Sequence, residues 1–152
     1  MTDTLTSPTG NSPEGDRSGD ARPVDTTAPA RRLRAVLAAN AVTSFGFSAA
    51  GLVAAPYWSD TLGIDSAGWI RVVSAGLVLF AIDVALVAWR ATASLPSAAL
   101  AISMGDLAWV AATGIALATI SFSTTGWILA VVIGAGVLDF ALLQLWFRSR
   151  LA

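Results

Sequence analysis

Residues 68–89 read GWIRVVSAGLVLFAIDVALVAW, an almost unbroken apolar run with the length of a membrane span. A helix rises about 1.5 Å per residue, so such a run crosses the roughly 30 Å of hydrocarbon in a bilayer. Three further runs of similar length lie at about 33–55, 98–120 and 127–147. A helix also satisfies its backbone polar groups internally, as lipid requires. The sequence therefore predicts an all-α membrane protein, a bundle of four transmembrane helices.

The overall composition agrees with a bilayer as the solvent of this chain. Of its 152 residues, 55% are hydrophobic and only 12% are charged, and the mean hydropathy is +0.70. A soluble domain of this size could not bury so many apolar side chains, because much of a small fold stays at its surface. The formal net charge of −1 gives no reason to expect nucleic acid as a partner. The expected partner is the lipid bilayer, with another membrane protein or a second copy of the chain as further candidates.

Several residue types that carry chemistry are missing from the sequence. It contains no Cys and no His, and all nine basic residues are Arg. These absences remove thiolate sites, the commonest general base and Schiff-base lysines. The Gly-Ala-Gly segment 134–136 lies inside a span and follows no strand, which excludes a phosphate loop. We therefore expect no catalytic residue, no cofactor, no metal ion and no enzymatic activity.

The N-terminal segment differs in composition from the rest of the chain. Residues 1–30 are rich in Thr, Ser, Pro, Gly and Asp and hold only two large aliphatic residues. Such a segment cannot bury enough apolar surface to offset its ordering entropy. It also lacks the basic start and short apolar run of a signal peptide. We expect a disordered cytoplasmic tail over 1–30 and a four-helix membrane domain over 31–152.

The arginines predict the orientation in the membrane. With a cytoplasmic N-terminus, every arginine but one lies on the cytoplasmic side, and Arg71 alone lies near the outer face. Because cytoplasmic loops carry an excess of basic residues, we expect a multi-pass protein of the inner or plasma membrane with both termini in the cytoplasm. Tryptophans support the helix ends, where their amphipathic rings favour the headgroup level: Trp58, Trp69, Trp89, Trp127 and Trp146.

Each expected span contains one strongly polar residue at a similar depth. Asn40, Asp83, Asp106 and Asp139 all lie roughly 9–14 Å from the cytoplasmic boundary, at about 1.5 Å per residue. An Asp near a helix centre costs about 2.5–3.5 kcal/mol on the insertion scale, so these side chains should face inward. We therefore predict a candidate polar cluster of these four residues inside the bundle.

Two functional interpretations of this cluster stay open. Interhelical hydrogen bonds would fix the packing of the four helices, in a non-enzymatic interaction or structural module of the membrane. Intramembrane carboxylates also mark ion pathways, so the alternative is a proton- or cation-linked transporter or transporter subunit that uses Asp83, Asp106 and Asp139.

A short internal repeat relates two of the spans. Residues 75–81 read AGLVLFA, and residues 135–141 read AGVLDFA. A shift of two helices keeps the orientation in the membrane, so this match would reflect a duplicated helix pair. Because these residue types are common in any span, the match is equally compatible with chance.

Three segments carry a family resemblance: APYWSDTLGI (55–64), RVVSAGLVLFA (71–81) and GDLAWVAATG (105–114). They resemble an uncharacterised family of small bacterial four-helix integral membrane proteins. The arrangement is also similar to that of DoxX-like proteins, which are four-helix membrane proteins, some of them linked to quinone-dependent oxidation. This second resemblance implies a quinone-linked membrane subunit as another alternative. It rests on size and helix count, and it implies no site residue.

Overall fold

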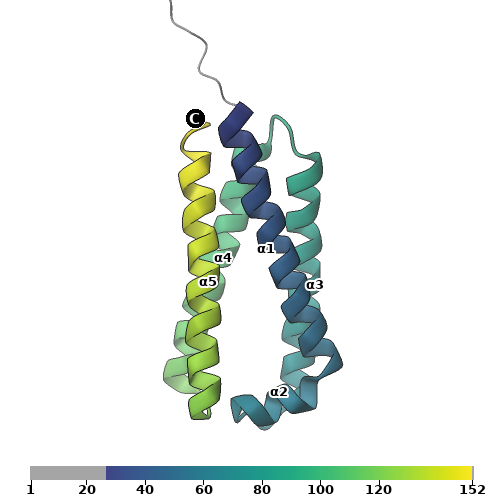
Figure 1. Cartoon of the computed structure of the whole chain (residues 1–152). Helices are drawn as coiled ribbons and strands as arrows, with labels where there is room; N and C mark the ends of the chain where they lie inside the picture. Colours follow the sequence, from purple (N-terminus) through teal and green to yellow (C-terminus); the bar gives the residue numbers. More distant parts are fainter. Residues whose placement is uncertain (1–26, 152) are drawn as a thin grey trace, which may run out of the picture.

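The computed structural model describes residues 27–151, and this part of the chain forms five helices and no strand (Figure 1). Four of them are long and apolar enough to cross a membrane. The predicted fold class, an all-α bundle of four transmembrane helices, is therefore confirmed. The helices are α1 (Thr27–Val53), α2 (Ala55–Leu62), α3 (Ala67–Arg90), α4 (Leu95–Thr119) and α5 (Thr124–Arg148).

The first helix begins earlier than the sequence pattern indicates. Residues 1–26, most of the predicted tail, lie outside the described residues, and Thr27–Ala30 form the first turn of α1. Pro29 is compatible with this turn because the first N–H groups of a helix have no partner within it. Pro29 is therefore part of α1 and does not belong to a preceding loop.

The short helix α2 was not expected from the sequence. The apolar run ends the first span at residue 55, just before Pro56, yet Pro56 stands in the first turn of α2. The break between the two helices is confined to Ala54, with φ −116° and ψ 34°. The helix then ends at Gly63, whose φ of 74° lies in the left-handed region that favours glycine. Proline thus begins a second helix here, as its fixed φ allows.

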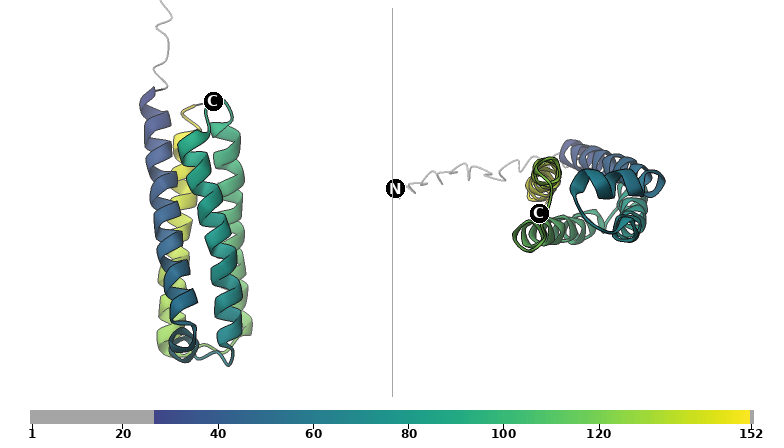
Figure 2. Two further views of the ribbon diagram at one scale, coloured as in Figure 1. Left: turned by 90° about the vertical axis from the view of Figure 1, so that its right-hand side faces the viewer. Right: turned by 90° about the horizontal axis from the view of Figure 1, so that it is seen from below.

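The four long helices form two closely packed pairs, α1–α3 and α4–α5, and α2 lies at one end of the bundle (Figure 1). Helix α1 packs against α3 and α5, and α4 packs against α5 and α3, so α1 and α4 are diagonal, as are α3 and α5. Seen from below, α2 runs across the end of the bundle (Figure 2). The start of α1 and the C-terminus lie together at the opposite end, which we call the terminal end (Figure 1).

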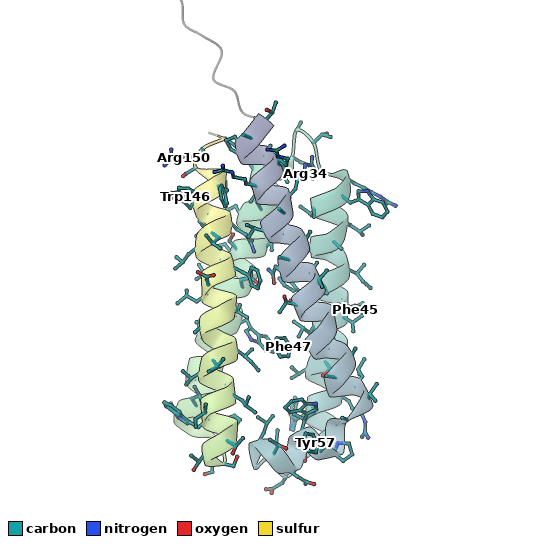
Figure 3. All side chains as sticks on the ribbon, in the orientation of Figure 1. Arg34, Phe45, Phe47, Tyr57, Trp146 and Arg150 are labelled. Carbon is teal, nitrogen blue, oxygen red and sulfur yellow. The ribbon has the colours of Figure 1, made fainter. Side chains whose placement is uncertain are left out.

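Side chains hold the terminal end together. The buried core there consists of apolar residues from α1, α3 and α4: Leu33, Leu37, Ala41, Val84, Leu95, Ala99 and Ile102. Arg34 donates from Nη1 to the Ala88 oxygen at 2.7 Å and from Nη2 to the Ala91 oxygen, so it caps the last carbonyls of α3. Arg148 Nε donates to the Pro96 oxygen at 2.9 Å. Figure 3 shows Arg34, Trp146 and Arg150 at this end and Tyr57 at the other.

At the opposite end, α2 is fastened to the start of α5. Ser123 N donates to the Leu62 oxygen at 2.9 Å, and Ser123 Oγ donates to the Thr61 oxygen at 2.6 Å. The same Oγ accepts a bond from Gly126 N at 2.9 Å and caps α5. The approach is so close that a Cβ on Gly126 would lie 2.5 Å from the Leu62 oxygen. These contacts therefore hold α2 against the start of α5, at the end of the bundle opposite the terminal end.

Candidate functional site

Three buried polar side chains from three helices meet within the bundle. Asn40 Nδ2 on α1 donates to Asp106 Oδ2 on α4 at 2.9 Å, and Gln144 Nε2 on α5 donates to the same oxygen at 3.0 Å. Asn40 and Asp106 are 2% exposed and Gln144 is fully buried. We call these three residues the polar cluster.

Two serines complete the bonding of the amides. Ser44 Oγ donates to Asn40 Oδ1 at 3.2 Å, one helical turn away on α1. Ser103 Oγ lies 3.1 Å from Gln144 Oε1 and 2.8 Å from the Ala99 oxygen, so its single hydrogen can serve either acceptor. Because each amide oxygen faces a hydroxyl, both amide nitrogens are oriented toward Asp106.

The structure brings together only two of the four residues predicted to form a cluster. Asn40 and Asp106 are bonded, whereas Asp83 and Asp139 are exposed on the outside of the bundle. The prediction compared depths along the helices and not angles around them. Buried Val84 follows Asp83 by one residue, which is about 100° of rotation at 3.6 residues per turn. Asp139 is displaced by about 200° from buried Ala141.

Gln144 was missing from the sequence prediction. It lies in the fourth span, three residues after the buried Ala141, and therefore on the same helix face. The prediction considered the carboxylates and one amide, Asn40. A search of every span for amides as well as acids would have found it.

One oxygen of Asp106 is left without a bond. Both amide donors end on Oδ2, and Oδ1 accepts no hydrogen bond from the described residues. No fully buried side-chain nitrogen or oxygen in this part of the chain lacks a partner, so Oδ1 must retain some access to open space. Asp106 lines a cavity, and we infer that Oδ1 is accessible from this cavity.

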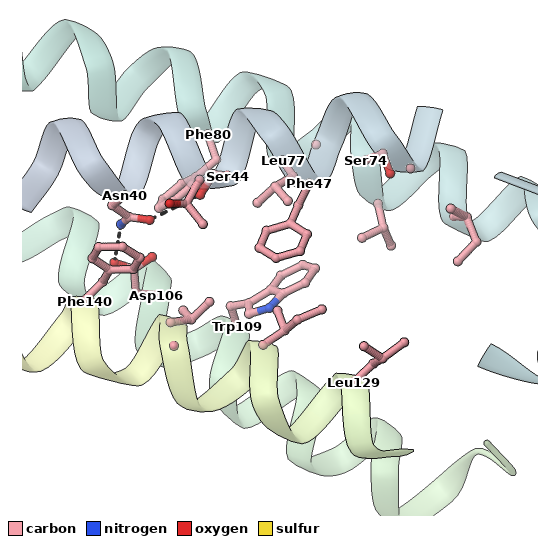
Figure 4. Close-up of a pocket in the computed structure, with 18 of the residues that line it drawn as sticks. Asn40, Ser44, Phe47, Ser74, Leu77, Phe80, Asp106, Trp109, Leu129 and Phe140 are labelled. Carbon is pink, nitrogen blue, oxygen red and sulfur yellow. Dashed lines mark hydrogen bonds between the residues drawn. The ribbon is translucent and has the colours of Figure 1, made fainter. Parts of the chain in front are cut away.

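The cavity lies between the α1–α3 pair and the α4–α5 pair, and it has a volume of about 710 Å³ (Figure 4). All five helices contribute to its wall, which is mostly apolar. Phe47 and Trp109 point into its middle, and Asn40 and Asp106 lie at one end (Figure 4). Trp58 brings α2 into the lining. The cavity thus combines a broad apolar space with a single acidic group.

Both copies of the internal repeat line this cavity. In the repeat, α3 contributes Gly76, Leu77 and Phe80, and α5 contributes the residues 60 positions later, Gly136, Val137 and Phe140. Val73 and Ile133, which precede the two copies in the same register, also line the cavity. Helices α3 and α5 are diagonal, so the two copies face the cavity from opposite sides. The repeated pattern of glycine, aliphatic residue and phenylalanine therefore coincides with the cavity wall.

The donor set does not favour a metal ion. Among the residues that the structure describes, no group of three or more His, Cys, Asp or Glu side chains lies close enough to hold one. The lining offers hydrogen bonds through one carboxylate oxygen and the hydroxyls of Thr43, Ser44 and Ser74. This arrangement is suited to a small molecule that is largely apolar and carries one polar group.

Comparison of the chain with protein-family models, with curated proteins and with solved structures finds no match. The cavity and the polar cluster are therefore the features of the molecule that bear on its function.

Proposed function

We propose that this small membrane protein is a non-enzymatic binding module, which holds a largely apolar small molecule inside its bundle. The observation that carries the proposal is the cavity of about 710 Å³ that ends at Asp106. Ligand sites in proteins enclose about 300–1,000 Å³ and combine apolar walls with a few polar groups that fix orientation. In this proposal the polar cluster supplies the oriented group.

A purely structural role accounts for only part of the geometry. Interhelical hydrogen bonds in membranes contribute about 0.6 kcal/mol each, and the two bonds to Asp106 Oδ2 fit that role. They do not account for an open space beside the bonded carboxylate. Tightly packed helices would be the expected result if stability were the whole function.

Transport through a chain of three aspartates has less support from the geometry. Asp83 and Asp139 are exposed on the outside of the bundle, away from the cavity lining. Among the described residues, a proton- or cation-linked transporter would have only one buried carboxylate in its spans, Asp106. Binding in the cavity is the step that such a transporter and a simple binding module share.

The arginine distribution supports a cytoplasmic location for the terminal end. Arg31, Arg32 and Arg34 lie at the start of α1, Arg90 and Arg148 at the ends of α3 and α5, and Arg150 just beyond. Arg71 alone lies near the α2 end. By the positive-inside rule, we place both termini in the cytoplasm. A C-terminal alkaline phosphatase fusion should be inactive in intact cells, and an active fusion would refute this orientation.

Binding can be tested with a photoactivatable long-chain alcohol on the protein in lipid nanodiscs. Labelling should be saturable, should be competed by unlabelled alcohol, and should fall on cavity-lining peptides such as those of Phe47 and Trp109. Leu77→Trp, which adds bulk to the lining, should remove the saturable component. Leu79→Trp is the matched control, because Leu79 is 70% exposed and does not line the cavity. Unsaturable labelling spread over lipid-facing residues would contradict the proposal.

A further inference from the structure

Asp106 has no cation near it within the described part of the chain. Its two bonds come from the neutral amides of Asn40 and Gln144. Arg34 and Arg148, at the terminal end, donate to backbone carbonyls instead. A carboxylate in an apolar interior is costly unless an opposite charge compensates it. The missing partner of this carboxylate can be a ligand.

The polar cluster holds the carboxylate with one oxygen available. The amides of Asn40 and Gln144 both occupy Oδ2, so they fix the orientation of the Asp106 side chain. Oδ1 is then free to accept a bond from the cavity side. A charged donor would form the stronger bond, because charge-assisted hydrogen bonds are roughly twice as strong as neutral ones.

The walls of the cavity carry several aromatic rings. Phe47 and Trp109 point into its middle, and Phe80 and Phe140 also line it (Figure 4). Phe80 is close to Gly105, the neighbour of Asp106, since its Cε2 would lie 3.3 Å from a Cβ on Gly105. Aromatic faces attract cations, with Trp the strongest, and the attraction increases when water is excluded. An aromatic wall that ends at one acidic group is a favourable environment for an organic cation with an apolar body.

We propose that the cavity binds a lipophilic organic cation, with its ammonium group at Asp106 Oδ1 and its apolar body along the aromatic walls. This inference rests on the proposed binding function and adds the chemical class of the ligand. The role assigned to Asp106 is that of the counter-ion of the ligand. Asp83 and Asp139, which are exposed on the outside of the bundle, have no part in it.

The test compares two competitors that differ only in their head group, which is an ammonium that can donate to Oδ1 or a methyl group. Dodecylammonium and its neutral carbon isostere, tridecane, compete with the photoactivatable alcohol in nanodiscs. Each concentration is expressed as a mole fraction in the lipid. For the wild-type chain we expect the cation to compete at a mole fraction at least about tenfold lower than that of the isostere, as an ion pair with aromatic contacts predicts. Equal potency of the two competitors would overturn the inference without any variant.

Variants then assign the preference to one carboxylate. Asp106→Asn keeps the shape of the side chain and should abolish the preference for the cation, while the isostere should compete as before. Asp83→Asn and Asp139→Asn each remove one exposed carboxylate from a span and should leave the preference unchanged. Loss of the preference in either control, or its retention in Asp106→Asn, would overturn the inference.

These outcomes separate the ligand class from the binding function. If the alcohol labels the cavity saturably but the cation has no advantage, the binding function stands and the ligand class is wrong. If no labelling is saturable, the proposed function itself fails. Should Asp106→Asn lose its native helix content or elute as an aggregate, Trp109→Leu provides the second variant. It should reduce the advantage of the cation severalfold and leave the isostere unaffected.

Discussion

The contact between α2 and α5 allows a substitution whose effect can be worked out atom by atom. In Gly126→Ala, the new Cβ would lie 2.5 Å from the oxygen and 2.8 Å from the Cα of Leu62. Both are backbone atoms, so no side chain can rotate away to relieve the overlap. We therefore expect α2 to move away from the start of α5.

The size of the effect follows from the bonds that this movement breaks. The two bonds that Ser123 donates to α2, at 2.9 and 2.6 Å, would be lost. Each contributes about 0.5–1.5 kcal/mol to the free energy of unfolding, for a loss of about 1–3 kcal/mol. Alanine also returns up to about 1 kcal/mol of helix propensity. With the full gain subtracted, the net expectation is a decrease in stability of about 1 kcal/mol, within a range of about 0–2 kcal/mol.

Gly46→Ala is the matched control on the outside of α1. Nothing lies within 4 Å of a Cβ at Gly46, so only the helix propensity should change. This variant should be more stable than the wild type by up to about 1 kcal/mol. The two substitutions are chemically identical, and they should change stability in opposite directions.

The measurement is reversible unfolding in mixed micelles with increasing dodecyl sulfate, followed by far-ultraviolet circular dichroism. Hydrogen exchange read peptide by peptide adds the location: exchange in 55–62 should increase in Gly126→Ala and remain unchanged in Gly46→Ala. Equal unfolding midpoints for the two variants would refute the reasoning, because they would show that the close approach of α2 to α5 does not exist in the membrane protein.

Two further predictions concern the buried and the exposed polar residues. Gln144→Leu removes one donor to Asp106 and the acceptor of Ser103, so the unfolding free energy should fall by about 0.6–1.7 kcal/mol in the same micelle assay; a variant as stable as the wild type would contradict the bonding seen here. Asp139→Leu replaces an exposed carboxylate on α5 with an aliphatic residue, so membrane insertion of this span should improve by up to about 3 kcal/mol. A glycosylation-based insertion assay measures this change, and unchanged insertion would indicate that another chain or a polar environment covers Asp139.

The membrane spans could be predicted from the sequence because each depends on a property that is local in the chain. An apolar run such as 68–89 and its flanking tryptophans are sufficient to locate a helix of the required length. The short helix α2 could not be recognised in the same way. Pro56 is compatible with the end of one helix and with the first turn of the next, and only the backbone geometry at Ala54 separates the two cases.

The depth of the candidate site residues in the membrane was predictable from the sequence, but the direction in which each side chain leaves its helix axis was not. Residue counts place Asp83, Asp106 and Asp139 at comparable depths, and they cannot indicate which helix face meets a neighbour. That depends on how the helices pack, which small residues influence without fixing it. The spacing of Asp106 from buried Ala99 and Ile102, seven and four residues away, is typical of one helix face. Asp139 has no such relation to Ala141, and the difference became visible only with the structure.

The two copies of the internal repeat can also be compared by the helix face on which their residues lie. Gly76 and Phe80 recur 60 residues later, Ile133 and Val137 correspond there to Val73 and Leu77, and all eight positions line the cavity. One buried pair in this register lies outside the cavity lining and differs in polarity, since Val84 on α3 corresponds to Gln144 on α5. Of these two helices, only α5 therefore donates a hydrogen bond to Asp106. In the proposed binding mode, a molecule with one polar end takes a single orientation, because among the described residues only one end of the cavity offers it a carboxylate.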